Sequence, residues 1–136
     1  MINKITSLTT SFILLFVSFT SLAFEEPLMP EAAFKFDAVV EGDRIRASWT
    51  AADDYYMYRD KIRFESGTPG VELGEPAYPA GKLKHGIRPD GSEGEVETYE
   101  HTVTLDIPIN KSVPGEFTLI AHSQGCAEKL GICYPP

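Results

Sequence analysis

The sequence of 136 residues contains two cysteines, Cys126 and Cys133, and both lie in its closing stretch QGCAEKLGICYPP. A pair of this kind can form a structural disulfide, form a redox-active disulfide, or bind a metal ion. A bond across so short a loop restricts the unfolded chain less than a bond between distant segments would. A short loop also presents its sulfurs near the surface, where a partner thiolate can attack. The residues alone leave the structural and redox uses open.

A metal site would need further ligands near the cysteines. His122 could add one nitrogen to the two sulfurs, a set that suits zinc or copper(I). The spacing is not the paired CxxC of a zinc ribbon, and the sequence offers no evident fourth ligand. We therefore interpret His122 as a polar residue on a strand and expect no metal. His85 and His101 lack the serine or cysteine arrangement of a hydrolase.

The first 23 residues indicate export. Lys4 is followed by an apolar, hydroxyl-rich run and by Ser21-Leu22-Ala23, the small-residue pattern of a cleavage site. We predict a signal peptide over 1–23, with an uncleaved membrane anchor as the alternative. Export places the cysteines in a compartment where disulfides form.

The remaining residues, 24–136, have the length of a single domain that buries its own core. The whole chain carries a formal net charge of −8, and removal of Lys4 with the signal makes it more negative. Nucleic acid and anionic membrane surfaces are therefore excluded as partners. No segment after residue 23 is apolar enough to cross a membrane. Contact with a membrane would come only from the signal segment or from a transmembrane domain missing from this sequence.

Apolar residues alternate with polar ones along most of this domain, which is typical of half-buried strands. The pattern predicts an all-β domain, a sandwich, because no stretch has a sustained helical period. The expected inward-facing sets are Phe34, Phe36, Ala38 and Val40; Ile45, Ala47 and Trp49; Tyr56, Tyr58, Ile62 and Phe64; and, in one long strand, Tyr99, His101, Val103, Leu105, Ile107 and Ile109.

Residues 66–95 interrupt this pattern with most of the chain's glycines and four of its 10 prolines. Such a composition predicts short edge strands joined by exposed loops. Its most turn-prone part is RPDGSEGE, residues 88–95, and a long loop of this kind is often functional.

Four separated blocks resemble one known family. QGCAEKLGICYPP is similar to the cysteine signature of the N-terminal periplasmic domain of DsbD, a thiol:disulfide interchange protein. PEAAFKFDA resembles the opening strand of that domain, DDYYMYRDKIRF its tyrosine-rich strand, and YEHTVTLDIPI the strand after its cap loop. The blocks occur in the family's order and cover about residues 28–136.

The resemblance implies an immunoglobulin-like β-sandwich whose cysteine pair carries electrons. Its donor would be a thioredoxin-like domain, and its acceptors would be oxidised periplasmic proteins: disulfide isomerases and the thioredoxin-like reductant of cytochrome c maturation. The implied activity is that of a protein-disulfide reductase, without flavin, nicotinamide or metal, because the electrons travel on sulfur. The alternative is a structural or ligand-binding sandwich with an inert disulfide.

The resemblance also assigns site residues. Cys133 falls at the cysteine that forms the mixed disulfide with partners, and Cys126 at the one that resolves it. Tyr56 and Tyr58 correspond to tyrosines beside the disulfide, although both also fit a plain core stripe. Asp90 falls at the cap-loop aspartate, where a carboxylate would raise the pKa of a nearby thiol; an ordinary turn aspartate before glycine is the alternative.

The sequence departs from the family in three places. Its cysteine loop, AEKLGI, is one residue longer than the usual one. Ser92 stands where an aromatic ring of the cap loop would cover the disulfide. The chain ends at Pro136, before the family's last strand, linker and transmembrane and thioredoxin-like domains, so we expect either a truncated sequence or a domain reduced by a separate protein.

Overall fold

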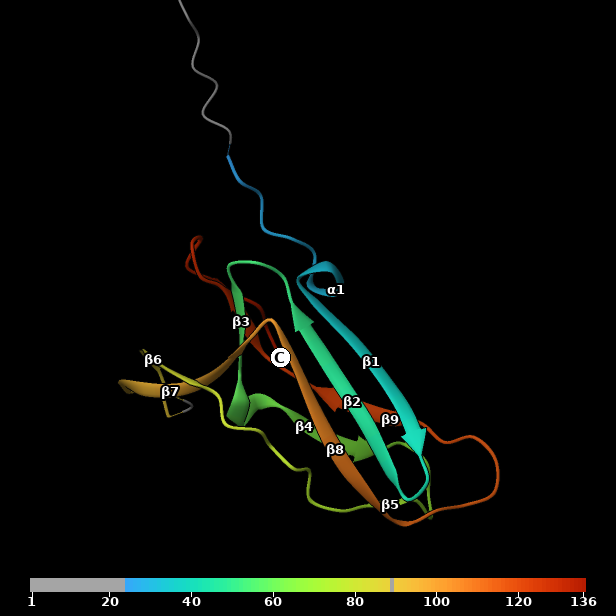
Figure 1. The fold of residues 1–136 in the computed structure, drawn as a ribbon. Helices are drawn as coiled ribbons and strands as arrows, with labels where there is room; N and C mark the ends of the chain where they lie inside the picture. Colours follow the sequence, from blue (N-terminus) through green and yellow to red (C-terminus); the bar gives the residue numbers. More distant parts are fainter. Residues whose placement is uncertain (1–23, 89) are drawn as a thin grey trace, which may run out of the picture.

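The computed structural model describes residues 24–88 and 90–136. The predicted signal peptide, 1–23, lies outside the described residues, as does Pro89. The elements of the described residues are one short helix, one 3₁₀ turn and eleven strands, of which Figure 1 labels α1 and β1 to β9: α1 (Pro30–Ala33), β1 (Phe34–Glu41), β2 (Arg44–Ala51), β3 (Tyr55–Tyr58), η1 (Arg59–Lys61), β4 (Arg63–Ser66), β5 (Glu72–Leu73), β6 (Lys82–Ile87), β7 (Glu93–Glu100), β8 (Thr102–Lys111), β9 (Leu119–His122), β10 (Gly125–Ala127) and β11 (Ile132–Cys133).

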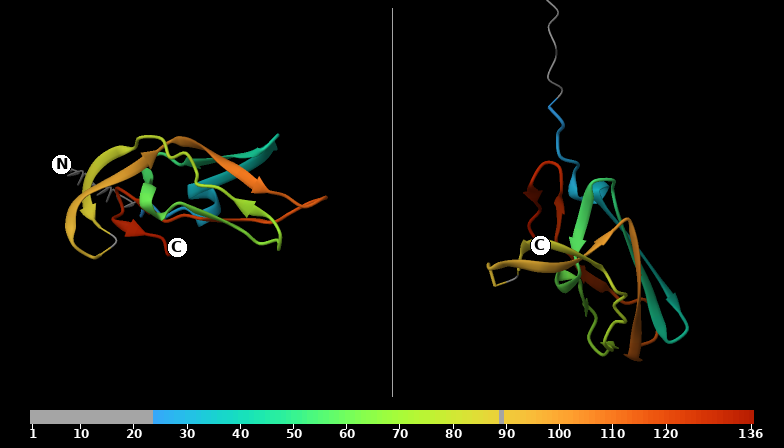
Figure 2. Two further views of the ribbon diagram at one scale, coloured as in Figure 1. Left: turned by 90° about the horizontal axis from the view of Figure 1, so that it is seen from below. Right: turned by 60° about the vertical axis from the view of Figure 1, so that its left-hand side comes forward.

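The strands form three antiparallel sheets, which confirms the prediction of an all-β domain. One sheet has the order β1-β2-β8-β5, and the second has the order β11-β10-β3-β7-β6. The third is the pair β4-β9, which lies behind the first sheet (Figures 1 and 2). Within residues 24–88 and 90–136, no helix is long and apolar enough to cross a membrane.

The core lies against the inner face of β2 and β8. Ile45, Ala47 and Trp49 are buried, as the alternation of β2 predicts. They pair directly with three buried residues of β8, namely Ile107, Leu105 and Val103. Directly opposed residues of antiparallel strands point to the same face, so these pairs form a continuous apolar layer.

The prediction of one continuous strand from Tyr99 to Ile109 is wrong, because the chain turns at one residue within it. His101 has a φ of 60°, so the chain turns there, with β7 ending at Glu100 and β8 beginning at Thr102. The left-handed conformation is sterically accessible to only a few residue types, among which histidine is enriched. β7 consequently pairs with β3 and β6, and β8 with β2 and β5.

A second expected strand is also divided. After β3, the 3₁₀ turn η1 (Arg59–Lys61) redirects the chain, and β4 joins a different sheet from β3. Ile62 is buried directly after this turn, and Phe64 lies on β4. Tyr56 and Tyr58 therefore do not share a continuous strand face with Ile62 and Phe64, contrary to the expectation.

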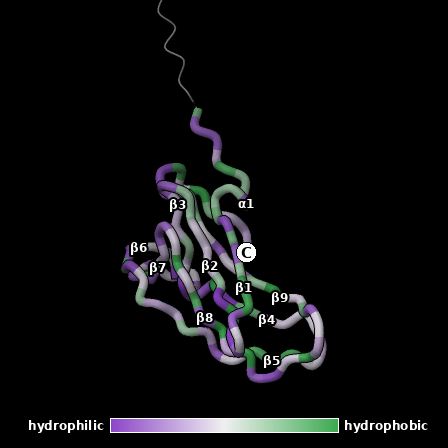
Figure 3. The backbone as a smooth tube through the Cα atoms, turned by 45° about the vertical axis from the view of Figure 1, so that its right-hand side comes forward, coloured by the Kyte–Doolittle hydropathy of each residue, from purple (hydrophilic) through white to green (hydrophobic). Residues whose placement is uncertain are grey.

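β1 exists as predicted, but its apolar face is not covered within the described part of the chain. Val40, on the face that was expected to be buried, is 53% exposed, and Val39, which points to the other face, is 50% exposed. With Phe117 and Leu119 across from them, they line a groove of about 550 Å³. Figure 3 shows the hydrophobic stretches on β1 and β9. Among the described strands, β1 pairs with β2 alone and β9 with β4 alone.

The glycine-rich segment behaves as its composition predicts. β5 has two residues and lies at a sheet edge, beside β8. β6 and β7 form a hairpin whose turn falls in the predicted RPDGSEGE stretch. The turn is closed by the backbone N–H of Arg88, which donates to the carbonyl of Ser92 over 2.7 Å.

Candidate functional site

The two cysteines form a disulfide across the β10–β11 hairpin. Cys126 and Cys133 are directly opposed in the strand ladder, and their Cα atoms are 4.0 Å apart. The chain between them reverses through a turn in which Gly131 has a φ of 63°, a conformation that favours glycine. This turn lets the six-residue loop close while Ala127 still pairs with Ile132.

The disulfide is unequally exposed. Cys126 is 2% exposed, because β10 lies between β3 and β11. Cys133 lies on the edge strand β11 and is exposed. It also lines a hollow of about 350 Å³ together with Tyr58, Lys61 and Gln124. An attacking thiolate can therefore reach Cys133 far more easily than Cys126.

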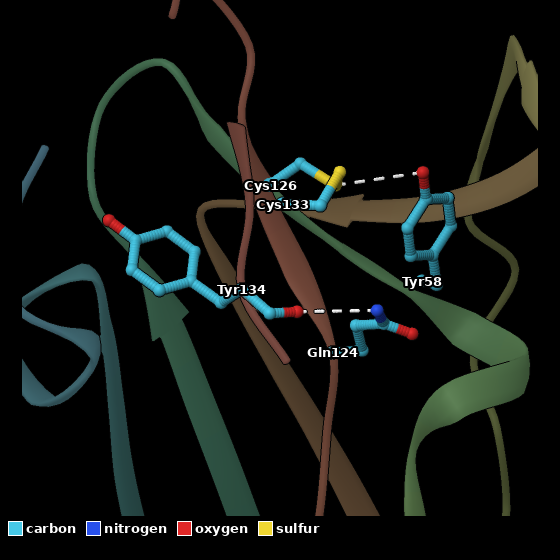
Figure 4. The surroundings of a disulfide bond; sticks show 5 residues. All are labelled: Tyr58, Gln124, Cys126, Cys133 and Tyr134. Carbon is cyan, nitrogen blue, oxygen red and sulfur yellow. Dashed lines mark hydrogen bonds between the residues drawn. A yellow bond between two sulfur atoms is a disulfide. The ribbon is translucent and has the colours of Figure 1, made fainter. Parts of the chain in front are cut away.

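Tyr56 and Tyr58 lie beside the disulfide. Tyr56 is directly opposed to Cys126 in the β3–β10 ladder. Tyr58 places its hydroxyl 3.6 Å from Sγ of Cys126, as Figure 4 shows. The hydroxyl is the donor, since a disulfide sulfur carries no hydrogen. The two tyrosine rings meet edge to face, with their centroids 5.6 Å apart.

The core-stripe interpretation of these tyrosines is wrong. The buried residues of β3 are Tyr55 and Met57, which belong to the main core cluster. Tyr56 and Tyr58 are half-buried and point to the opposite face, because successive residues of a strand alternate. The sequence YYMY is apolar on both faces, so its periodicity could not identify the inner one.

Strand register aligns four residues on the outer face of the second sheet. Cys133 opposes Cys126, Cys126 opposes Tyr56, and Tyr56 opposes Glu100 of β7. Side chains in such a row project from the same face. The disulfide is thus one end of a row that runs through a tyrosine to a carboxylate.

Lys84 of β6 completes this face. Its ammonium lies 2.8 Å from Glu100, 2.6 Å from Glu128 and 4.6 Å from the ring centroid of Tyr56. Burial disfavours the charged form of Lys84, but hydrogen bonds to both carboxylates outweigh this and raise its pKa. The hydrogen bond from Lys84 to Glu100, followed by those from Lys82, lowers the pKa of Glu100.

Tyr56 is held as a neutral phenol. Burial, followed by its hydrogen bond with Tyr58, raises the pKa of Tyr56 well above its ordinary value. Tyr56 therefore supplies no negative charge beside the sulfurs at neutral pH. The two tyrosines contribute apolar contact and a hydroxyl donor there.

Asp90 lies in the exposed turn between β6 and β7. Its carboxylate accepts hydrogen bonds from the hydroxyl of Ser92 over 2.6 Å and from its backbone N–H over 2.9 Å. These two bonds lower the pKa of Asp90. The hairpin reaches the hollow beside Cys133 through Arg88 and Gly91, whereas Asp90 does not line it. Of the residues assigned from the resemblance, the two tyrosines thus lie beside the disulfide, whereas Asp90 is hydrogen-bonded to Ser92 within the turn.

Several residues around the cysteines were not assigned a role from the sequence. Gln124 donates from Nε2 to the carbonyl of Tyr134 over 3.2 Å (Figure 4), and the N–H of Tyr134 donates to Gly125 over 2.9 Å. The hydroxyl of Tyr134 donates to the carbonyl of Leu28. These contacts fix the segment that follows Cys133. The QGC and CYPP motifs contain Gln124, Gly125 and Tyr134, and this was the sequence signal that could have identified them.

His122 was considered as a metal ligand beside the two cysteines. This residue lies on β9, where Nε2 is 3.3 Å from a carboxylate oxygen of Glu65. In the described ranges, no three histidine, cysteine or acidic side chains gather closely enough to hold a metal ion. His122 therefore belongs to the β4–β9 pair.

Comparison with known proteins identifies the family. Residues 24–136 match the family model described as "Thiol:disulfide interchange protein DsbD, N-terminal". The chain is 40% identical over 121 residues to DsbD of Pseudoalteromonas atlantica, covering 88% of this chain and 19% of that protein. It is 35% identical over 129 residues to DsbD of Ralstonia nicotianae, covering 90% and 20%. The chain thus spans about a fifth of the length of these curated relatives.

Two solved structures from Neisseria meningitidis have the same fold. One is the reduced DsbD N-terminal domain, with a TM-score of 0.70, 35% identity, and coverage of 80% of this chain and 82% of that one. The other is a complex between the DsbD N-terminal and PilB N-terminal domains, with a TM-score of 0.65, 32% identity and coverage of 82% and 83%. The expected immunoglobulin-like sandwich is confirmed. By sequence and by fold, this chain belongs to the family of DsbD N-terminal domains.

Proposed function

We propose that this chain is a periplasmic thiol–disulfide exchange module, which receives electrons from a thioredoxin-like donor and passes them to oxidised periplasmic proteins. The observation that carries the proposal is the unequal exposure of the disulfide, with Cys126 at 2% and Cys133 exposed on an edge strand. A disulfide used only for stability needs no accessible sulfur. One accessible and one protected sulfur suit an attacking cysteine and a resolving cysteine.

The exchange needs no cofactor. In the reduced domain, the thiolate of Cys133 attacks one sulfur of the acceptor's disulfide, and the other acceptor sulfur leaves as a thiolate. The thiolate of Cys126 then attacks Sγ of Cys133, which breaks the mixed disulfide and releases the second acceptor sulfur. The acceptor gains two electrons and takes up protons from water, and the Cys126–Cys133 bond forms again. A donor dithiol reduces the domain by the reverse sequence.

The surroundings of the disulfide support this assignment of roles. Cys126 lies 3.6 Å from the Tyr58 hydroxyl and within a central strand, so its sulfur stays in place when the bond opens. Cys133 borders the hollow below the β6–β7 hairpin, where a partner can approach. Asp90 precedes Gly91, which lines that hollow, and we propose that its carboxylate adds negative charge near the approach path.

The partners and the compartment belong to the same proposal. The relatives in the comparison are thiol:disulfide interchange proteins, and one related domain is solved in complex with the PilB N-terminal domain. We assign thioredoxin-like donors and acceptors, among them disulfide isomerases and the thioredoxin-like protein of cytochrome c maturation. The module acts as one domain of a protein-disulfide reductase in the periplasm, attached to the inner membrane in a full-length protein.

A redox titration tests the proposal against an inert disulfide. Structural disulfides of exported proteins have midpoints below roughly −300 mV, whereas exchange proteins lie at less negative potentials. The purified protein is equilibrated with glutathione or dithiothreitol buffers, and the thiols are counted by alkylation and mass spectrometry. A midpoint in the range of exchange proteins supports the function, and a midpoint well below −300 mV contradicts it.

A further inference from the structure

We propose that Lys84 is a positioning residue of the redox site, whose ammonium clamps the cysteine loop to the sheet and so favours closure of the disulfide. The biological role of this clamp depends on the proposed function. Its geometry and its effect on the sulfur chemistry can be tested without any partner.

The ammonium of Lys84 joins three segments that are distant in sequence. Glu128 lies in the loop between the two cysteines and approaches Nζ to 2.6 Å. Glu100 lies at the end of β7 and approaches it to 2.8 Å. The ring of Tyr56, which opposes Cys126, lies 4.6 Å away. An ammonium has three N–H donors, and two carboxylates and one aromatic face use its whole capacity.

Burial distinguishes this lysine from an ordinary surface lysine. The side chain of Lys84 is 14% exposed, whereas that of its neighbour on the same strand face, Lys82, is 64% exposed. Lys82 also contacts Glu100, at 3.1 Å, but no contact joins it to Glu128 or Tyr56 in the structure. Lys82 is therefore a matched control with the same charge, strand and sheet face.

The clamp matters because the disulfide and the ion pair restrain the same loop. When the disulfide is closed, Glu128 is already positioned, and the ion pair forms at little entropic cost. When the disulfide is open, the loop keeps its contacts with Asp54 but has lost its covalent restraint, so the ion pair must supply more of its order. Two restraints on one loop strengthen each other reciprocally. The clamp therefore stabilises the oxidised state more than the reduced state and increases the effective concentration of each thiol at the other.

The experiment measures the equilibrium constant for disulfide formation against glutathione at a pH where both thiols are protonated. The variants are Lys84→Met, Glu128→Gln and their combination, with Lys82→Met as control. Lys84→Met should lower the constant about threefold, the size expected of a partly exposed ion pair. Glu128→Gln should lower it similarly, and the double variant no further. Lys84→Arg should restore most of it, and Lys82→Met should leave it unchanged.

Each outcome decides the proposal. An unchanged constant in both single variants would show that Lys84 only adds to general stability, and a larger constant would show that it favours the reduced form; either overturns the clamp. Because Glu128 is 55% exposed, its variant keeps the test valid even if Lys84→Met fails to fold. Failure of the proposed function is a different result, a parent midpoint in the structural range, and it leaves the ratios between variants measurable.

Discussion

The β10–β11 hairpin and the β6–β7 hairpin meet beside Cys133, and they are attached to the domain by different bonds. The β10–β11 hairpin is closed by the disulfide, and its strand β10 pairs with β3. Its loop is also tied to the β2–β3 turn, since the N–H of Glu128 donates to the carbonyl of Asp54 over 2.8 Å and Lys129 pairs with the Asp54 carboxylate at 2.6 Å.

The turn of the β6–β7 hairpin is held mainly by bonds within itself. The N–H of Arg88 donates to Ser92, the N–H of Gly91 donates to Arg88, and Asp90 accepts from Ser92. The hairpin is fastened at its base instead, where Lys84 contacts Glu100 and Glu128. The sulfurs are thus held by bonds to neighbouring segments, whereas the β6–β7 turn beside Cys133 is held by its own bonds.

The largest expected effect tests the difference between the two sulfurs. Cys126→Ser leaves the exposed Cys133 to attack a partner and removes the thiol that resolves the mixed disulfide. It should therefore accumulate a mixed disulfide with a thioredoxin-like partner, whereas Cys133→Ser should accumulate little because Cys126 is buried. Non-reducing gel electrophoresis with mass spectrometry measures both. Equal trapping by the two variants would contradict the assigned roles.

The second effect compares the backbones of the two hairpins. A Cβ on Gly125 would lie 2.6 Å from the backbone carbonyl oxygen of Tyr56 and against the ring of Phe34, so Gly125→Ala should destabilise the domain by about 2–3 kcal/mol. At Gly91 the space is open and only the φ of 84° opposes a side chain, so Gly91→Ala should cost about 1 kcal/mol. Urea unfolding of both variants gives the comparison, and similar losses would show that the two hairpins are equally constrained.

A third change would add a cover beside Cys133. Ser92→Phe places a ring in the β6–β7 turn, and it should slow reduction of the disulfide by dithiothreitol severalfold, because access to the sulfur limits exchange. Ser92→Ala removes the same hydroxyl bond to Asp90 without adding a ring, and it should not slow the reaction. Stopped-flow or quenched alkylation follows the rate. If the phenylalanine variant reacts as fast as the alanine variant, residue 92 does not shield Cys133.

The smallest expected effect concerns pH at the base of the β6–β7 hairpin. Hydrogen bonds from Lys84 and Lys82 lower the pKa of Glu100 in the folded state. The stabilisation is therefore complete above the ordinary pKa of glutamate and is lost as pH falls through the lower folded value. Glu100→Gln should remove that part of the pH dependence, by less than ~1 kcal/mol. Urea unfolding between neutral and acidic pH measures it, and identical pH profiles for parent and variant would exclude this contribution.

The sequence predicted what depends on local patterning. The alternation of Ile45, Ala47 and Trp49 identified a core strand, and the glycine and proline density of residues 66–95 identified short strands and an exposed turn. The family resemblance, based on the cysteine and tyrosine motifs, correctly placed Tyr56 and Tyr58 beside the disulfide. Periodicity alone would have placed both tyrosines in the core.

The remaining features depend on pairing between distant segments. His101 continues the alternation of its neighbours in sequence, so only its positive φ reveals that the strand turns into another sheet. Lys84 contacts Glu100 and Glu128, which are 16 and 44 positions away, and no local pattern links them. Strand order decides these contacts, and strand order is a tertiary property.

The single exposed sulfur has a kinetic consequence. If the domain exchanges thiols as proposed, a donor and an acceptor both bond to Cys133, because Cys126 is buried within the sheet. The two partners therefore exclude each other, and the domain must release one partner before it binds the next. Turnover should follow a ping-pong scheme, in which excess acceptor slows refilling by occupying the reduced and oxidised domain alike. The throughput of such a carrier is set by how quickly its partners depart, so weak docking serves it better than tight docking.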